Sequence, residues 1–132
     1  MAAEGAMELK WLRLNLFKNM QYVLDAKNQK LGRLASEVAM ILQDKKKPTF
    51  DPKEIGIDTV VVKNLKAIEM TGNKKRDKIY YHHTGYIGHL REESFESLFK
   101  RIPERVLKLA VWNMLPKNSL RSSRIKRLKI EL

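Results

Sequence analysis

The residues best suited to chemistry in this sequence are basic and aromatic side chains gathered in a few short stretches. Residues 71–78 combine a Thr-Gly-Asn turn with four bases, and they lead directly into Tyr-Tyr-His-His at residues 80–83. Cations and backbone amides bind phosphate groups, whereas aromatic rings stack on unpaired bases. Structured RNA also offers 2′-hydroxyls, so this order of residues predicts contact with RNA. Because alternate strand residues face opposite sides, we expect one of Tyr80 and Tyr81 in the core.

Two further basic stretches indicate the same kind of partner. Three lysines at residues 45–47 follow a predicted helix, where cations also suit the negative end of the helix dipole. From Arg105 to Lys129 there are eight bases and no acid, whereas a merely solvated face usually mixes both signs. The predicted RNA-binding set is Lys45, Lys46, Lys47, Thr71, Gly72, Asn73, Lys74, Lys75, Arg76, Lys78, Tyr81, His82, His83, Arg105, Lys108, Lys117, Arg121, Arg124, Lys126 and Arg127.

The spacing of other residues argues against catalytic and metal sites. His82 and His83 are adjacent in a predicted strand and point apart, and no cysteine or His-x-x-x-His pair accompanies them. The Gly72-Asn73-Lys74 turn lacks the phosphate-loop pattern, and the segment from Gly85 to Gly88 lacks the third glycine of a dinucleotide fingerprint. We therefore expect no enzyme activity, metal, cofactor or small-molecule substrate.

Composition favours a polyanionic partner. The chain has 132 residues, of which 27 are Lys or Arg and 15 are Asp or Glu, giving a formal net charge of +12. Hydrophobic residues make up 43%, enough for one core, and cysteine is absent, which removes disulfides and thiolate zinc sites. No apolar run approaches the roughly 20 residues of a membrane helix, so no membrane partner is expected.

Apolar periodicity predicts an α/β fold. Residues 22–24 form a short strand-like run, and Thr-Val-Val-Val at residues 59–62 is typical of a parallel strand covered on both faces. Residues 31–42 carry apolar side chains at helical spacing after a turn at Asn28. Residues 79–83 also read as a strand.

The last third is predicted to be helical. Ser94 is suited to cap a first helix, and Pro103 restarts a second one that ends before Pro116. This second helix is expected to bury Leu107, Ala110, Val111 and Met114. Residues 1–19 are interpreted as an N-terminal extension, with Met20 as a candidate start, and residues 20–132 as a single domain.

Seven short motifs, taken together and in order, resemble the bacterial-type large-subunit ribosomal protein L-thirteen family. They are Tyr-Val-Leu-Asp-Ala at 22–26, Leu-Gly-Arg-Leu-Ala at 31–35, Val-Val-Val at 60–62, Thr-Gly-Asn-Lys at 71–74, Tyr-Tyr-His-His-Thr-Gly at 80–85, Pro-Glu-Arg-Val at 103–106 and Met-Leu-Pro-Lys at 114–117. The resemblance covers nearly everything from Tyr22 to Ile130. It differs at Asn113, where the family usually has glycine, and at residues 118–122, where the family has a glycine-containing turn.

The resemblance implies a three-layer α/β/α sandwich on a small, mostly parallel sheet, with basic loops and a basic C-terminal helical segment. It also implies a structural role in the cytoplasmic large ribosomal subunit, with binding to its RNA, contact with neighbouring ribosomal proteins and action in early assembly. Residues 71–78, 80–85 and the segment after Pro116 would then lie on RNA. Two other classes stay open at this point, namely an RNA chaperone or regulator outside ribosomes and a nucleotide-using enzyme.

Overall fold

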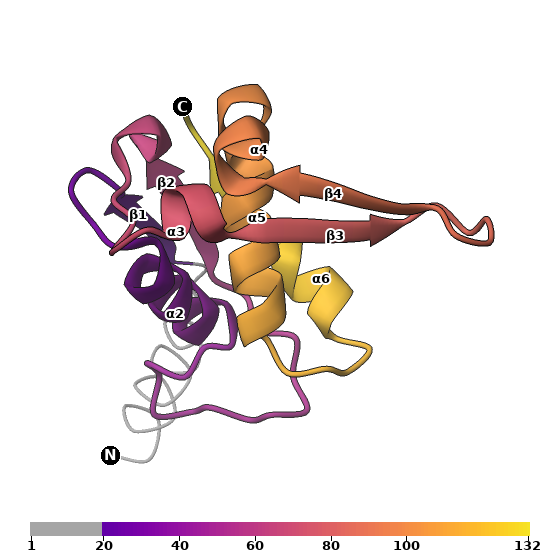
Figure 1. The fold of residues 1–132 in the computed structure, drawn as a ribbon. Helices are drawn as coiled ribbons and strands as arrows, with labels where there is room; N and C mark the ends of the chain where they lie inside the picture. Colours follow the sequence, from indigo (N-terminus) through magenta and orange to yellow (C-terminus); the bar gives the residue numbers. More distant parts are fainter. Residues whose placement is uncertain (1–19) are drawn as a thin grey trace, which may run out of the picture.

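The computed structural model describes residues 20–132 of the chain (Figure 1). The elements in chain order are β1 (Gln21–Asp25), α2 (Leu31–Leu42), β2 (Thr59–Lys63), the 3-10 turn η1 (Leu65–Ala67), α3 (Lys74–Asp77), β3 (Ile79–His83), β4 (Leu90–Ser94), α4 (Phe95–Arg101), α5 (Pro103–Met114), α6 (Arg121–Ile125) and β5 (Leu128–Ile130). The interpretation of residues 1–19 as an extension falls outside this part. Within it, no helix has the length and apolar character needed to cross a bilayer.

The sheet that organises the fold has three parallel strands in the order β1-β2-β5. Tyr22 pairs with Val60, and Val60 pairs with Leu128 on its other side. Because side chains alternate along a strand, these three residues share one face, and Val60 and Leu128 belong to the hydrophobic core. Val23, on the opposite face, is 56% exposed. The predicted α/β class with a small, mostly parallel sheet is confirmed.

Helices α2 and α5 lie on the core face of the sheet and pack against each other (Figure 1). α2 buries the predicted residues Leu31, Leu34, Ala35, Val38 and Leu42, but it ends at Leu42, earlier than the predicted end at the basic run of residues 45–47. Asn28, at the predicted turn before it, adopts a left-handed conformation with φ 58°. The sheet and this helical layer are the two layers of the expected sandwich that residues 20–132 show.

The buried side of α5 differs in detail from the predicted one. The helix buries Pro103, Val106, Leu107 and Val111. Ala110 is only partly buried, and the prediction for Met114 is wrong, because Met114 is 42% exposed. The Met114 Sδ lies 3.3 Å from the Ser36 Oγ on α2. Gly32, one turn earlier on α2, has no side chain to cover Met114, and the space beside it is open.

A second, antiparallel sheet of two strands, β3 and β4, extends away from the domain (Figure 1). β3 is the predicted strand, whereas the sequence does not predict β4, because Leu-Arg-Glu-Glu-Ser lacks apolar alternation. Gly85 and Gly88, with φ of 92° and 74°, form the bend between the strands. Ser94 caps α4 as predicted, because its Oγ accepts a hydrogen bond from the Ser97 N–H at 3.4 Å.

Candidate nucleic-acid interface

The predicted basic segment at residues 71–78 is exposed along its whole length. Residues 74–77 form the one-turn helix α3, not a loop, and α3 packs against α4 and β4. Lys74 donates a long hydrogen bond of 3.5 Å from its Nζ to the Thr71 Oγ1. Among residues 20–132, none of the four cations of this segment forms an ion pair. Their charges are therefore available to phosphate groups outside the protein.

The hairpin formed by β3 and β4 presents aromatic and imidazole rings beside this segment. Tyr81 is 62% exposed, and His82 and His83 are exposed as well. Tyr80 points the other way and packs against the core, and burial raises the pKa of its hydroxyl. The prediction that one of the two tyrosines belongs to the core is confirmed. His83 is held in place at the bend, because its Nδ1 accepts a hydrogen bond from the Gly85 N–H at 3.0 Å.

A groove of about 620 Å³ joins the hairpin to helix α5. The strands contribute His82 and Arg91, and α5 contributes Arg105. Arg101 of α4 also lines the groove and is paired with Glu93 at 2.8 Å. The structure thus brings together His82 and Arg105, which belong to separate predicted segments. Arg91 and Arg101 were not singled out in the sequence, because each stands next to or near glutamates there.

A second groove, of about 270 Å³, connects the basic segment to the end of α5. Lys74 and Lys78 line it together with Lys30 and Met114. Asn113 lines both grooves, so the two grooves meet near the end of α5. We use the name α3–hairpin surface for the exposed predicted residues of the basic segment and of β3 together with Arg105, namely Thr71, Gly72, Asn73, Lys74, Lys75, Arg76, Lys78, Tyr81, His82, His83 and Arg105. Because side chains alternate along β3, His82 lies on one face of the hairpin, and Tyr81 and His83 lie on the other.

Comparison with known proteins identifies the family. The model of the family described as Ribosomal protein L13 matches residues 19–130. The chain belongs to this family. The Large ribosomal subunit protein uL13 of Alkalilimnicola ehrlichii is 51% identical over 109 residues, which cover 83% of this chain and 77% of that protein. The protein of the same name from Dichelobacter nodosus is 45% identical over 129 residues, or 98% of this chain and 83% of its own. The protein of the same name from Synechocystis sp. is 50% identical over 109 residues, which cover 83% of this chain and 72% of that protein.

The family resemblance at the seven motifs is thereby confirmed. The structure also shows the backbone at the two places where the sequence differs from the family, Asn113 and residues 118–122. Asn113 lies inside α5, and Asn118 follows it in the turn before α6. Neither adopts a positive φ, which among non-glycine residues of the described chain is found at Asn28, Asp44 and Asn64. A glycine is therefore not required by the backbone at Asn113 or Asn118 in this member of the family.

Arg124 contradicts its predicted role. It is 2% exposed, and its guanidinium donates hydrogen bonds to the carbonyl oxygens of Pro52, Glu54 and Ile55 at 3.4, 2.7 and 3.3 Å. The irregular segment at 52–55 has no helix or strand partner for these carbonyls, and arginine supplies several donors in a fixed geometry. The prediction that Arg124 binds RNA is wrong, because its side chain is buried and occupied.

Two more arginines of the C-terminal run are engaged inside the domain. Arg127 is half-buried and donates to the carbonyl oxygens of Leu42, Ile55 and Asp58 at 2.5, 2.6 and 2.7 Å. Burial lowers the pKa of Arg127, although the nearby carboxylates oppose that shift. Arg121 donates to the Trp112 carbonyl oxygen and lies over the indole ring, 4.2 Å from its centroid. The guanidinium groups of both arginines therefore bind other parts of the same domain.

The three lysines that follow α2 also differ in whether their charges are already paired inside the domain. Lys47 forms an ion pair of 2.6 Å with Asp58, whose side chain is only 2% exposed. Lys46 pairs with Glu37 at 3.1 Å on the surface, which leaves the ammonium accessible, and Lys45 is exposed. Lys45 and Lys46 remain candidates for phosphate contact, whereas Lys47 compensates a buried charge.

The other predicted bases are exposed but lie outside the grooves described above. Lys108 forms a surface pair with Glu104 at 3.1 Å, and Lys117 and Lys126 make no ion pair within residues 20–132. In the same part of the chain, no three potential metal ligands come together.

Proposed function

We propose that this protein is a structural component of the large ribosomal subunit. The observation that carries the proposal is the match to the Ribosomal protein L13 family over residues 19–130, together with relatives named as large-subunit proteins at 45–51% identity. A fold whose described residues form one hydrophobic core is compatible with a scaffold role.

The proposed partner is large-subunit ribosomal RNA, bound through the α3–hairpin surface. Its four cations at residues 74–78 are exposed and make no internal ion pair in the described chain, so each can neutralise a phosphate. Tyr81, His82 and His83 supply exposed rings for unpaired bases. Lys45, Lys46, Lys108, Lys117 and Lys126 are proposed as additional phosphate contacts elsewhere on the described domain. Neighbouring ribosomal proteins are proposed as further partners.

An early place in subunit assembly fits the same features. The described domain has its own hydrophobic core, with Leu34, Val38, Val60 and Leu107 fully buried. We expect a domain with such a core to fold without RNA and therefore to be able to bind the RNA before other proteins arrive.

The proposal is tested on ribosomal subunits of the source cell. Large subunits are washed at high salt, and the protein is quantified against other large-subunit proteins by mass spectrometry. We expect about one copy per large subunit and none in small subunits, because a scaffold protein is stoichiometric. Recovery with free RNA but not with mature large subunits would instead assign the protein to an RNA chaperone or regulator outside ribosomes.

A further inference from the structure

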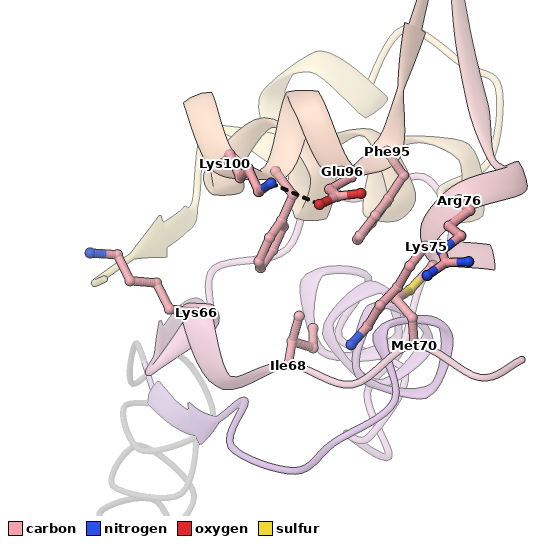
Figure 2. Close-up of a pocket in the computed structure, with 9 residues that line it drawn as sticks. Lys66, Ile68, Met70, Lys75, Arg76, Phe95, Glu96 and Lys100 are labelled. Atoms are coloured by element: carbon pink, nitrogen blue, oxygen red, sulfur yellow. Dashed lines mark hydrogen bonds and ion pairs between the residues drawn. The ribbon is translucent and has the colours of Figure 1, made fainter. Parts of the chain in front are cut away.

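A pocket of about 380 Å³ lies between α4, α3 and the chain that follows η1 (Figure 2). Its apolar part is formed by Ile68, Met70, Phe95 and Phe99. The two phenyl rings are stacked, with centroids 5.4 Å apart and planes at 13°. Phe95 is buried, whereas Phe99 is only partly buried and its ring borders the pocket. The volume falls in the range of sites for small organic ligands.

The rim of this pocket is strongly basic. Lys66, Lys75, Arg76 and Lys100 surround the apolar part, with Glu96 as the one acid among the lining residues. Figure 2 shows Lys75 and Arg76 on one side of the opening and Lys66 on the other. Four cations and one carboxylate line the pocket, so the lining carries a net charge of +3, and in Figure 2 the ammonium group of Lys66 is directed away from the other labelled residues.

Glu96 gives the pocket one polar acceptor. Its Oε1 accepts a hydrogen bond from the Lys100 Nζ at 2.7 Å. This bond holds the pKa of Glu96 below its ordinary value, so the group is a carboxylate at neutral pH. A carboxylate has further lone pairs, and it can accept N–H bonds from a ligand in the pocket.

We propose that the pocket binds one nucleoside phosphate, with its base against the phenyl rings and its phosphates on the rim cations. A nucleotide combines the two properties that the pocket requires, a planar apolar ring system and negative charge beside it. An apolar peptide side chain would fill the apolar part of the pocket but would leave the excess positive charge of the rim uncompensated.

The nucleotide can come from RNA or from solution, and the structure favours RNA. Lys75 and Arg76 belong both to the pocket rim and to the α3–hairpin surface, so an RNA strand on that surface passes the pocket. In this form the inference rests on the proposed RNA binding. Glu96 selects among bases, because guanine offers two adjacent N–H donors on its Watson–Crick edge, whereas uracil offers one between two carbonyl oxygens.

The test uses the full-length protein and three seven-nucleotide RNAs in fluorescence anisotropy. One RNA is all uridine, the second has a central guanosine, and the third has a central abasic site. We expect the wild-type protein to bind the guanosine RNA about 5- to 150-fold more tightly than the abasic RNA, which is the range found for one stacked base. Phe99→Leu keeps an apolar side chain but removes the ring, so it should abolish this preference without changing the affinity for abasic RNA. Glu96→Gln should reduce the preference of guanosine over uridine.

The controls separate the possible failures. Lys129→Ala removes an exposed charge on β5, outside the residues that line the pocket, and should leave the guanosine preference intact. Thermal unfolding shows whether Phe99→Leu is folded, and Glu96→Gln provides an independent readout if it is not. Titration with guanosine monophosphate tests whether the pocket binds a free nucleotide. If the wild type binds this nucleotide and Phe99→Leu does not, the pocket takes its ligand from solution. Equal binding of all three RNAs by the wild type, with no nucleotide binding, overturns the inference but leaves RNA binding standing. No measurable RNA binding at all refutes the proposed RNA partner instead.

Discussion

The sharpest prediction concerns the salt dependence of RNA binding. The triple variant Lys74→Ala, Lys75→Ala and Arg76→Ala removes three exposed cations that have no ion-pair partner in the described chain. Each cation that neutralises a phosphate contributes about 0.7 to 0.9 to the slope of log affinity against log salt concentration. Removal of all three cations should therefore flatten the slope by about 2 to 3. Between 50 and 200 mM salt, the affinity of the wild type should fall by a factor of roughly 20 to 40 more than that of the variant.

The assay is filter binding of labelled large-subunit ribosomal RNA at five salt concentrations. The matched control is Lys27→Ala, Lys53→Ala and Lys129→Ala, which removes the same charge from exposed positions outside the α3–hairpin surface. We expect the slope of this control to differ from the wild-type slope by less than about 0.9, the share of a single neutralised phosphate. Equal flattening in both triple variants would refute the reasoning, because net charge and not the α3–hairpin surface would then drive binding. An unchanged slope in the first triple variant would also refute it.

Three further predictions concern the domain itself. Arg124→Met should lower the free energy of unfolding by about 2 to 3 kcal/mol in urea titrations, because three carbonyl oxygens lose a buried charged donor, while the salt slope of RNA binding stays the same. A stable variant with a flatter slope would show that Arg124 faces RNA after all. Ser94→Ala should cost about 0.5 to 1 kcal/mol in the same titration, at the low end for a helix cap because the cap bond is 3.4 Å long, and no loss would exclude that cap. The pKa of Asp25 lies below its ordinary value of 3.8, because its carboxylate accepts bonds from the Lys27 N–H and the Asn64 side chain. Its stabilisation is therefore present above pH 3.8 and lost as the pH falls through the lowered pKa, so Asp25→Asn should be less stable than the wild type at pH 7 and equally stable near pH 2.

Local pattern was sufficient for the elements whose apolar residues follow a clear helical spacing or form a continuous β-branched run. The helical spacing of residues 31–42 predicted α2 and its buried face, and the β-branched run at 59–62 predicted the central strand. Ser94 and Pro103 marked helix starts because cap and N1 preferences are local. β4 was missed because Leu-Arg-Glu-Glu-Ser is largely exposed and is a strand only through its pairing with β3.

The candidate site was predicted in part. The exposed basic segment at 71–78 and the ring-bearing strand at 79–83 were found by composition. Lys66 and Lys100 of the pocket were missed, because each is a single lysine in an ordinary stretch and only the packing of α4 near η1 brings them to one rim. No sequence pattern marks these two lysines, because their common position depends on the packing of Phe95 and Phe99 beside Ile68 and Met70.

The sequence by itself determined the charge of the protein, its family, its α/β class and the kind of partner that we propose, since these depend on residue types and on order along the chain. The tertiary structure alone decided which cations are available to that partner. Arg124 and Lys126 stand two positions apart in the same acid-free run, yet one is buried on carbonyl oxygens and the other is exposed. The reason is physical: an irregular segment must find donors for its carbonyls, and which basic side chain supplies them depends on hydrogen bonds between residues about 70 positions apart.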